Sequence, residues 1–555
     1  MSTKMIPLGI ENFQDVVESC YYVDKTKLIA TLCDAPTGAA FLFTRPRRFG
    51  KSLAISAMKY FFSDEYSSEA LFSDLSIAKL HNGEYLGEMN RYPVIHLNFK
   101  DIQAPTFERM IESMASLMCD AFTHFHLDEE GSFSEWEKAD IAKVTQKSCD
   151  VVELSFSLKK LCDLLCKKKS RRVILLIDEY DAPVLSALEN GYEPEATSFF
   201  KVFLGSALKG NNSLAKAVLS GVLQIAMASI FSGLNNLIVD DGFTEQEECF
   251  AFTEEETKQL LEYYGFHGDM DEVRRHYGGY QLSEKECYCP WSVLSFVRSG
   301  FRYGHYWGAT SANRVLHYAQ SDAVINAVSK LLSGESMYAY IKDPITAKEL
   351  NEQSHFLSLL LRSGYLRGES SFILGTKRLS IPNEDVRSAL KEDVLQAYGH
   401  NQFDLLNALR SSFLEGKPKE LENILREYLL SALSCFDLGQ ERSYQIMVMT
   451  LTSLLFDDAT IRTEENVGEG RCDLSIIGGK QSDFAIIMEF KYCGLKTRND
   501  NLRAKAKEAL KQIYDKDYLE SARKAGKSQI ICFGAGFAGK RVALESKIEE
   551  LNPGK

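Results

Sequence analysis

Apolar residues follow two distinct spacings along the first half of the chain. Short runs that are apolar throughout are typical of strands buried on both faces of a parallel sheet, and segments with an apolar residue every three or four positions are typical of amphipathic helices. Strands that alternate with helices predict a doubly wound parallel α/β sheet for residues 1–285. The strands are expected at 41–43, 93–99, 172–178 and 214–221, and the helices at 53–62, 195–209 and, as a mixed insertion, about 105–168.

The pattern changes in the second half of the chain. Residues 286–395 are mostly helical with short extended pieces, which predicts a small helical domain, with a winged-helix arrangement as one option. Residues 396–555 begin with amphipathic helices and continue with strands at 471–477 and 484–492, which a short turn joins into a hairpin. We therefore expect a second α/β domain at the C-terminal end.

The segment from Thr44 to Ser52, Thr-Arg-Pro-Arg-Arg-Phe-Gly-Lys-Ser, lies between a predicted strand and a predicted helix. Gly-Lys-Ser at such a junction is the context of a phosphate-binding loop, because the amides at a helix N-terminus favour an anion. Lys51 is then expected to reach the terminal phosphates and Ser52 to bind Mg²⁺. The first glycine of the usual motif is replaced by Arg45, so the motif needs support from a second site.

Two carboxylates supply that support at the end of the apolar run 172–178. The carboxyl end of a parallel strand lies beside the phosphate loop in open α/β sheets. Asp178 is expected to hold Mg²⁺ directly or through water, and Glu179 to orient or deprotonate the attacking water. A solvated loop after a core strand is the alternative. Together the two segments predict that the chain binds ATP with Mg²⁺.

A second group of charged residues lies on the C-terminal hairpin. Glu489 and Lys491 are two positions apart and therefore face the same side of a strand, and Asp473 on the neighbouring strand can reach the same point. Two carboxylates and a lysine suit phosphodiester hydrolysis with Mg²⁺ or Mn²⁺ as the metal. The alternative is an exposed Glu–Lys pair on the solvent face of a hairpin.

The helix predicted after this hairpin is rich in lysine. Lys505, Lys507 and Lys511 lie on it together with Arg503, and Gln512 is expected to face inward. A basic helix beside a two-carboxylate site suits a DNA backbone, although a solvated charged face explains the lysines equally well.

Composition sets limits on the compartment. The net charge of −13 does not by itself indicate a nucleic-acid-binding protein, although a local basic face can lie within an acidic total. The N-terminal residues lack a signal-peptide core and no run of about 18 apolar residues is present, so we expect no membrane anchor. Thirteen scattered cysteines without a disulfide or zinc pattern suggest reduced thiols in a cytoplasmic protein.

The N-terminal segments resemble the AAA-ATPase-like domain of a widespread, mostly bacterial family. The resemblance rests on residues 21–26, 45–52, 176–181, 229–236 and 277–280. In that family an arginine-rich phosphate loop replaces the glycine-rich one, so Arg45 is a family trait. The resemblance implies nucleotide binding by the loop and strand residues Arg47, Arg48, Phe49, Gly50, Lys51, Ser52 and Asp178.

A second resemblance rests on residues 441–444, 468–473, 486–491 and 512–513. They resemble the restriction-endonuclease-like domain of the PD-(D/E)XK nuclease superfamily. The resemblance implies catalytic roles for Asp473, Glu489 and Lys491, for Gln512 on the following helix, and for Glu441 on the first nuclease helix. Gln445 replaces a histidine of the family pattern, and Asn466, next to Glu465, replaces a glutamate.

These observations lead to two hypotheses from different classes. The leading one is an ATP-dependent or ATP-regulated DNA nuclease, in defence or in mobile-element biology. The other is an ATP-controlled DNA- or protein-binding switch with an inactive nuclease fold. AAA-type ATPases often complete their sites with an arginine from a neighbouring subunit, so a homo-oligomer is an option that the sequence leaves open.

Overall fold

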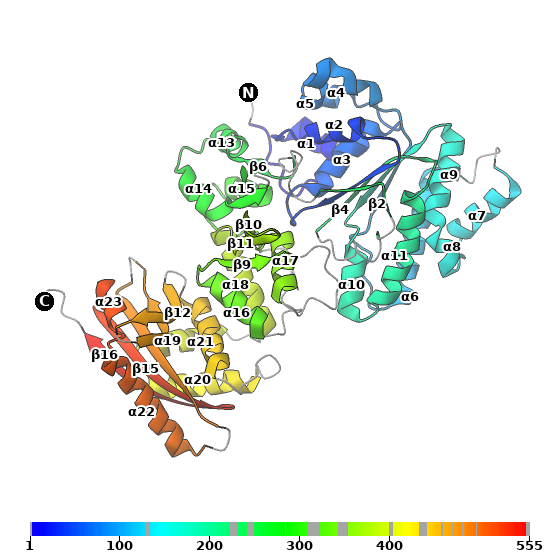
Figure 1. The fold of residues 1–555 in the computed structure, drawn as a ribbon. Coiled ribbons are helices and arrows are strands. Elements are labelled where there is room, and N and C mark those ends of the chain that lie inside the picture. Colours follow the sequence, from blue (N-terminus) through cyan, green and yellow to red (C-terminus); the bar gives the residue numbers. More distant parts are fainter. Residues whose placement is uncertain are drawn as a thin grey trace.

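The computed structural model places the N-terminal and C-terminal sheets at opposite ends of the molecule, with the middle elements between them (Figure 1). It describes residues 3–127, 133–222, 231, 234–240, 249–282, 285–308, 322–341, 353–398, 403–431, 441–456, 459–468, 470–479, 482–494 and 497–550.

The N-terminal part is built on a five-stranded parallel sheet in the order β2-β3-β4-β1-β5. Its strands are β1 (Ala39–Thr44), β2 (Val94–Asn98), β3 (Val173–Asp178), β4 (Leu214–Gly221) and β5 (Leu237–Asp240). Alternate residues of each strand enter two different cores: Leu175 packs into one and Leu176 into the other. The apolar runs in the sequence are continuous because the strands are buried on both faces, which confirms the predicted doubly wound sheet.

Helices cover both faces of this sheet. One core contains residues from α1 (Phe13–Ser19), α2 (Lys27–Asp34), α3 (Lys51–Phe62), α4 (Glu69–Phe72) and α5 (Ser76–Lys79), after which the 3₁₀ segment Leu80–Glu88 leads into β2. The other contains residues from α6 (Phe107–His124), α7 (Glu135–Thr145), α8 (Val151–Ser155), α9 (Ser157–Lys169), α10 (Ala182–Asn190) and α11 (Glu193–Leu208). The predicted helical insertion therefore closes one whole face of the sheet.

Two small sheets and six helices follow in the described middle part of the chain. The first group has the sheet order β6-β8-β7 and contains β6 (Phe252–Thr253), α13 (Glu254–Tyr263), α14 (Met270–Tyr277), β7 (Tyr280–Leu282), β8 (Lys285–Tyr288) and α15 (Pro290–Arg298). The second has the antiparallel order β10-β11-β9 and contains α16 (Asp322–Leu332), β9 (Met337–Tyr340), α17 (Gln353–Ser363), β10 (Arg367–Ser370), β11 (Thr376–Ser380) and α18 (Glu384–Tyr398). The hairpin β7–β8 crosses the expected boundary at residue 285. The division into 1–285, 286–395 and 396–555 remains a prediction.

The C-terminal part has a mixed five-stranded sheet in the order β12-β13-β14-β15-β16. It contains α19 (Phe403–Leu414), α20 (Pro418–Ser431), α21 (Glu441–Leu455), β12 (Thr460–Val467), β13 (Gly470–Ile477), β14 (Phe484–Tyr492), α22 (Asn499–Asp515), α23 (Glu520–Lys524), β15 (Gln529–Ala538) and β16 (Arg541–Glu550). β13 and β14 pair antiparallel, as the predicted hairpin requires, and β14 pairs parallel to β15.

Helix α22 lies directly on strand β15. A Cβ built on Gly534 would come within 2.1 Å of the Ala506 carbonyl oxygen, so this approach needs a residue without a side chain. The contact fixes α22 over the strand next to β14. Among the described residues, no helix is both long and apolar enough to cross a membrane.

A buried carboxylate in the middle part makes stability dependent on pH. Asp393 on α18 accepts a hydrogen bond from the Tyr365 hydroxyl, and burial raises its pKa to about 7. The pKa of an aspartate in an unfolded chain is about 3.9. The stability gained from the neutral form is therefore present below that pH and is lost as the pH rises through 7.

Asp393→Asn is therefore expected to raise the thermal unfolding midpoint at pH 8.5 by at least about 2 °C, and to change it much less at pH 5. The amide oxygen can still accept the Tyr365 hydrogen bond without a buried charge. Differential scanning calorimetry at both pH values measures the effect, with the exposed Glu392→Gln as the control. An equal shift at both pH values would contradict the argument.

Candidate functional site

The loop between β1 and α3 turns through two residues in the left-handed region. Gly50, the N-cap of α3, has φ +78°, and Arg48 has φ +71°. Lys51 is 5% exposed, and its ammonium group donates hydrogen bonds of 3.0 Å to the carbonyl oxygens of Arg45 and Pro46. Lys51 is thus held against its own loop at the N-terminus of the helix, where an anion is favoured.

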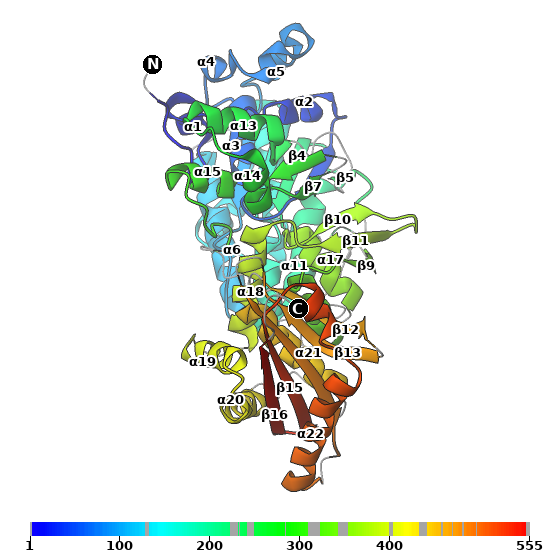
Figure 2. The ribbon, with the colours of Figure 1, turned by 90° about the vertical axis from the view of Figure 1, so that its left-hand side faces the viewer.

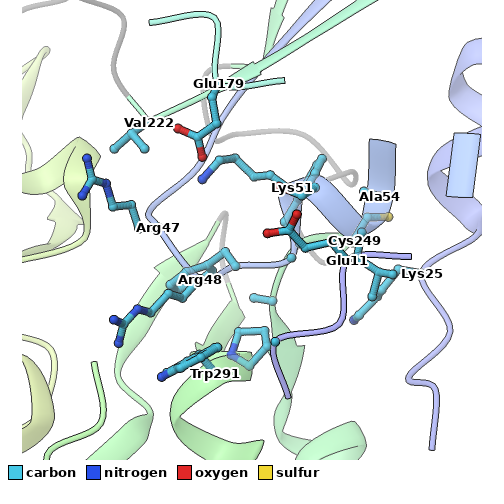
Figure 3. Close-up of a pocket in the computed structure, with 18 of the residues that line it drawn as sticks. Glu11, Lys25, Arg47, Arg48, Lys51, Ala54, Glu179, Val222, Cys249 and Trp291 are labelled. Atoms are coloured by element: carbon cyan, nitrogen blue, oxygen red, sulfur yellow. The ribbon is translucent and has the colours of Figure 1, made fainter. Parts of the chain in front are cut away.

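Carboxylates from the end of β3 and the turn that follows it lie near this lysine. Burial lowers the pKa of Lys51, and the charges of Glu179, Asp181 and Asp178 act in the opposite direction. Figure 3 shows the side chains of Lys51 and Glu179 pointing toward one another. Lys51, the residue expected to bind phosphate, and the candidate catalytic carboxylates therefore belong to one site.

Asp178 ends strand β3 and is 1% exposed. It accepts a hydrogen bond from the Ser220 hydroxyl at the end of β4, and its Oδ1 accepts one of 3.1 Å from the Glu179 amide. Glu179 itself has φ +55°, a region that residues other than glycine rarely adopt. The strained turn directs Glu179 away from the strand axis and toward the loop, as catalytic residues often are.

A cavity of about 740 Å³ opens beside these residues. It is lined by the phosphate loop from 47 to 52, by the N-terminal segment 7–11, by Glu179 and Asp181, and by Trp291 of α15 (Figure 3). This volume is within the range of small-molecule and cofactor sites. The basic loop, the partly exposed Ser52 and the nearby carboxylates fit a nucleotide with Mg²⁺.

The arginines of the loop have different environments. Arg45 is buried, donates to its own Thr44 carbonyl and lies over the ring of Phe250 at 5.2 Å. Arg47 and Arg48 line the cavity. The Arg48 guanidinium stacks on Trp291 at 4.9 Å and donates a 2.5 Å hydrogen bond to the Tyr306 carbonyl oxygen. Arg45 and Arg48 therefore connect the loop to neighbouring parts of the structure.

Phe49, expected among the nucleotide-binding residues, is fully buried. Its ring meets the ring of Tyr280 edge-on, with centroids 4.9 Å apart, and belongs to the core of the middle part. Its side chain therefore anchors the loop.

Sequence reasoning did not assign roles to Asp181 and Gly221. Asp181 is 1% exposed and accepts a 3.0 Å hydrogen bond from the Val222 amide. A Cβ on Gly221 would lie 2.6 Å from Asp181 Oδ1, so β4 and the turn after β3 meet here without a side chain between them. The sequence does hold a signal for Asp181, because it ends the run Asp-Glu-Tyr-Asp at 178–181. This run contributed to the family resemblance, but Asp181 received no role of its own.

The second site lies on the C-terminal sheet, where four predicted residues meet. The Lys491 ammonium group is 3.3 Å from Glu489 Oε1, and Gln512 of α22 donates a hydrogen bond to the same oxygen. Asp473 Oδ2 accepts a 2.8 Å hydrogen bond from the Phe490 amide, the residue between Glu489 and Lys491. The structure thus brings together Asp473, Glu489, Lys491 and Gln512 from two strands and one helix.

The electrostatics of this site favour a cation. Glu489 is 2% exposed, and burial together with the Asp473 carboxylate raises its pKa to about 8. Its Oε2 is buried and accepts no hydrogen bond from the described part of the chain. A buried carboxylate oxygen without a donor is costly, and a hard divalent cation is the ligand that this oxygen and Asp473 fit.

Two further residues support the site. Gln445 of α21 donates a 2.8 Å hydrogen bond to the Asp473 carbonyl oxygen, and the Tyr518 hydroxyl lies 3.4 Å from Gln512 Nε2. The sequence identified Gln445 only as a departure from the family pattern and did not single out Tyr518. Glu441 begins α21, but its side chain lies outside the described residues.

The basic helix is largely charge-compensated. Arg503 pairs with Glu422 at 2.9 Å and with Glu545 at 3.2 Å, and Lys505 pairs with Glu508 at 2.6 Å. Lys511 lies 3.9 Å from Asp515. These pairs favour the interpretation that the basic residues of α22 form a solvated charged face. They argue against a helix whose basic residues are reserved for the DNA backbone.

Comparisons with known proteins match a part of the chain around each of the two sites to a family model. Residues 7–231 match a family model described as a predicted AAA-ATPase, and residues 439–547 match one described as the PD-(D/E)XK nuclease superfamily. A relative from Azotobacter chroococcum mcd 1, the "Uncharacterized protein in vnfD 5'region", is 25% identical over 564 residues, with 95% of each chain covered. The chain therefore contains an AAA-ATPase-like domain followed by a domain of the PD-(D/E)XK nuclease superfamily.

Proposed function

We propose that this chain is an ATP-regulated DNA nuclease whose N-terminal site binds and hydrolyses ATP and whose C-terminal site cleaves a phosphodiester. The observation that carries the proposal is the meeting of Asp473, Glu489, Lys491 and Gln512 around a buried carboxylate oxygen to which no described residue donates. A role in defence or in mobile-element biology, in a bacterium, is part of the proposal and rests on the family resemblance. The cytoplasm as its compartment is also part of the proposal and is supported by the thirteen cysteines, which show no disulfide pattern.

At the nuclease site, Asp473 and Glu489 would hold Mg²⁺ or Mn²⁺, together with the main-chain carbonyl of Phe490. A bound divalent cation polarises the phosphoryl oxygen and activates water. Lys491, 3.3 Å from Glu489, is placed to orient the attacking water and to stabilise the charge on the phosphate. Gln512 donates to one oxygen of Glu489, and the other oxygen would be available to hold the cation.

At the nucleotide site, the chain's own groups divide the work between binding and water activation. Lys51 would exchange the loop carbonyls of Arg45 and Pro46 for phosphate oxygens. Ser52 and Asp178 would hold Mg²⁺, which neutralises charge on the phosphates. Glu179 is placed near Lys51 to orient the attacking water.

Regulation needs a physical connection between the nucleotide site and the rest of the chain. Pro46, Arg48 and Phe49 each contact the middle part of the molecule, through Gly364, Trp291 and Tyr280 respectively. A rearrangement of the loop around phosphate would therefore move contacts on both sides of the cavity. These contacts support ATP control by the loop.

Plasmid nicking with Mg²⁺ or Mn²⁺, with and without ATP, tests the whole proposal. Metal-dependent nicking that ATP alters would support it. ATP binding without cleavage would instead favour the nucleotide-controlled binding switch.

Glu489→Gln is expected to reduce metal-dependent nicking at least a hundred-fold while leaving ATP affinity unchanged, because it removes the charge that the cation needs. Nicking rates and ATP titration calorimetry measure the two effects. The exposed Glu508→Gln on α22 is the matched control. Cleavage by Glu489→Gln at the wild-type rate would refute the site assignment.

Lys51→Met is expected to weaken ATP binding at least ten-fold, because a hydrogen bond to a charged group contributes about 1.5–3 kcal/mol. Since the substitution also removes a buried charge, the unfolding midpoint should not fall. Titration with a fluorescent ATP analogue measures the affinity, with the exposed Lys27→Met as control. Unchanged affinity in Lys51→Met would exclude the phosphate-binding role.

Gly364→Ala tests the connection between the middle part and the loop. Gly364 has φ +89°, and a Cβ there would come within 2.6 Å of Pro46 Cβ. The variant should lower ATP affinity because it displaces the phosphate loop from outside the nucleotide pocket.

Gly334→Ala separates this effect from backbone strain. Gly334 has φ +90° and no atom within 4 Å of the built Cβ, so both alanines pay the same strain of about 1–2 kcal/mol. Only Gly364→Ala should change the affinity for ATP, measured by the same titration. Equal affinities in the two variants would show that the contact with Pro46 is not used.

A further inference from the structure

The hairpin of β10 and β11 ends in three consecutive large apolar residues. Phe372, Ile373 and Leu374 are 111%, 68% and 96% exposed, and the hairpin projects beyond the neighbouring helices (Figure 2). Solvent-exposed hairpin tips normally carry polar turn residues. Three adjacent exposed apolar side chains at a projecting tip therefore indicate a binding element.

The sheet that carries this tip also presents aromatic residues. Tyr338 and Tyr340 of β9 are 68% and 57% exposed and lie on the same side of the strand. The opposite face packs into the core through Leu379. A Cβ on Gly375 would lie 2.5 Å from the Tyr340 ring, so the ring lies directly against the base of the tip. The tip and the tyrosines form one continuous surface.

The charges on this surface are mainly positive. On the face that carries the tyrosines, strands β10 and β11 present Arg367 and Arg378 against the single carboxylate of Glu369, in a chain with a net charge of −13. Arg378 is opposite Tyr338 in the antiparallel register. Both arginines lie near the same carboxylate, at 3.4 Å and 3.6 Å. One carboxylate cannot neutralise two guanidinium groups, so the surface attracts an anion.

The charge of this surface argues against a second copy of the chain as its partner. A two-fold contact would bring the same surface of both copies together, so the arginines would face like charges, which is unfavourable. Exposed tyrosines beside arginines are instead a platform on which unpaired bases stack, and Phe, Ile and Leu at a narrow tip are side chains that enter opened base steps.

We propose that this surface, made of Tyr338, Tyr340, Arg367, Phe372, Ile373, Leu374 and Arg378, binds DNA at a junction between paired and unpaired strands. The apolar tip inserts at the last base step, the tyrosines stack on the unpaired bases, and the arginines contact the phosphates. The inference rests on the proposed nuclease function and adds the class of substrate, a DNA with an opened end.

The full-length protein is titrated in EDTA, which prevents cleavage, with a fluorescein-labelled forked duplex and a blunt duplex of the same length. Replacing Phe372, Ile373 and Leu374 together by serine should raise the Kd for the forked duplex at least ten-fold and for the blunt duplex less than three-fold. Tyr338→Ala combined with Tyr340→Ala should show the same preference. Trp136→Ser, at an 86% exposed residue on α7, should change neither Kd.

Unchanged binding of the forked duplex by the triple serine variant would overturn the proposal. The same result with a shift from dimer to monomer in light scattering would identify the tip as a contact between copies. Nicking by the wild-type protein is measured in parallel with Mg²⁺. Intact nicking with unchanged fork binding would remove only this inference, whereas a wild-type protein that neither binds nor cuts DNA would remove the proposed function with it.

Discussion

The structure depends on the way in which one short loop is held between two hydrophobic cores. Arg45 begins the loop in the core of the parallel sheet, under Phe250, and Phe49 ends it in the core of the middle part, against Tyr280. A glycine-rich phosphate loop takes its shape from backbone freedom. Here large side chains fix the loop at both ends, and only Gly50 and Arg48 adopt positive φ. The side chains of the arginine-rich loop therefore fix its position by packing, in addition to supplying positive charge.

Much of the fold could be predicted from the sequence, because a strand that is buried on both faces is a continuous run of apolar residues. The strand 214–221 was predicted to the residue, since every one of its eight positions is buried. The hairpin of β13 and β14 followed from two apolar runs and a short turn. The sheet order was not predictable, because β4 pairs with both β1 and β3 through residues that are almost all apolar. Apolar runs of equal character carry little information about their neighbours.

The residues of the candidate sites could also be predicted only in part. Asp473, Glu489 and Lys491 were identified because strand periodicity places charged side chains on one face. Tyr518 was missed, since it contacts Gln512 only through the tertiary packing that follows α22. The environment of Phe49 was also beyond the sequence, because its partner Tyr280 lies more than two hundred positions away. Local spacing reveals residues that share an element, whereas partners from distant elements appear only in the folded chain.

Both sites keep a buried ionisable group whose cost in stability a ligand of opposite charge would offset. Lys51 donates to two main-chain carbonyls, and one oxygen of Glu489 has no donor among the residues that the structure describes. An apolar side chain of similar size would be more stable in either place. Such groups reduce stability in the free protein and raise the gain on binding, since the anion or cation then pairs with a group that folding has already desolvated. The same physical argument therefore applies to both sites, with charges of opposite sign. A buried lysine would bind phosphate at one site, and a buried carboxylate would bind a metal ion at the other.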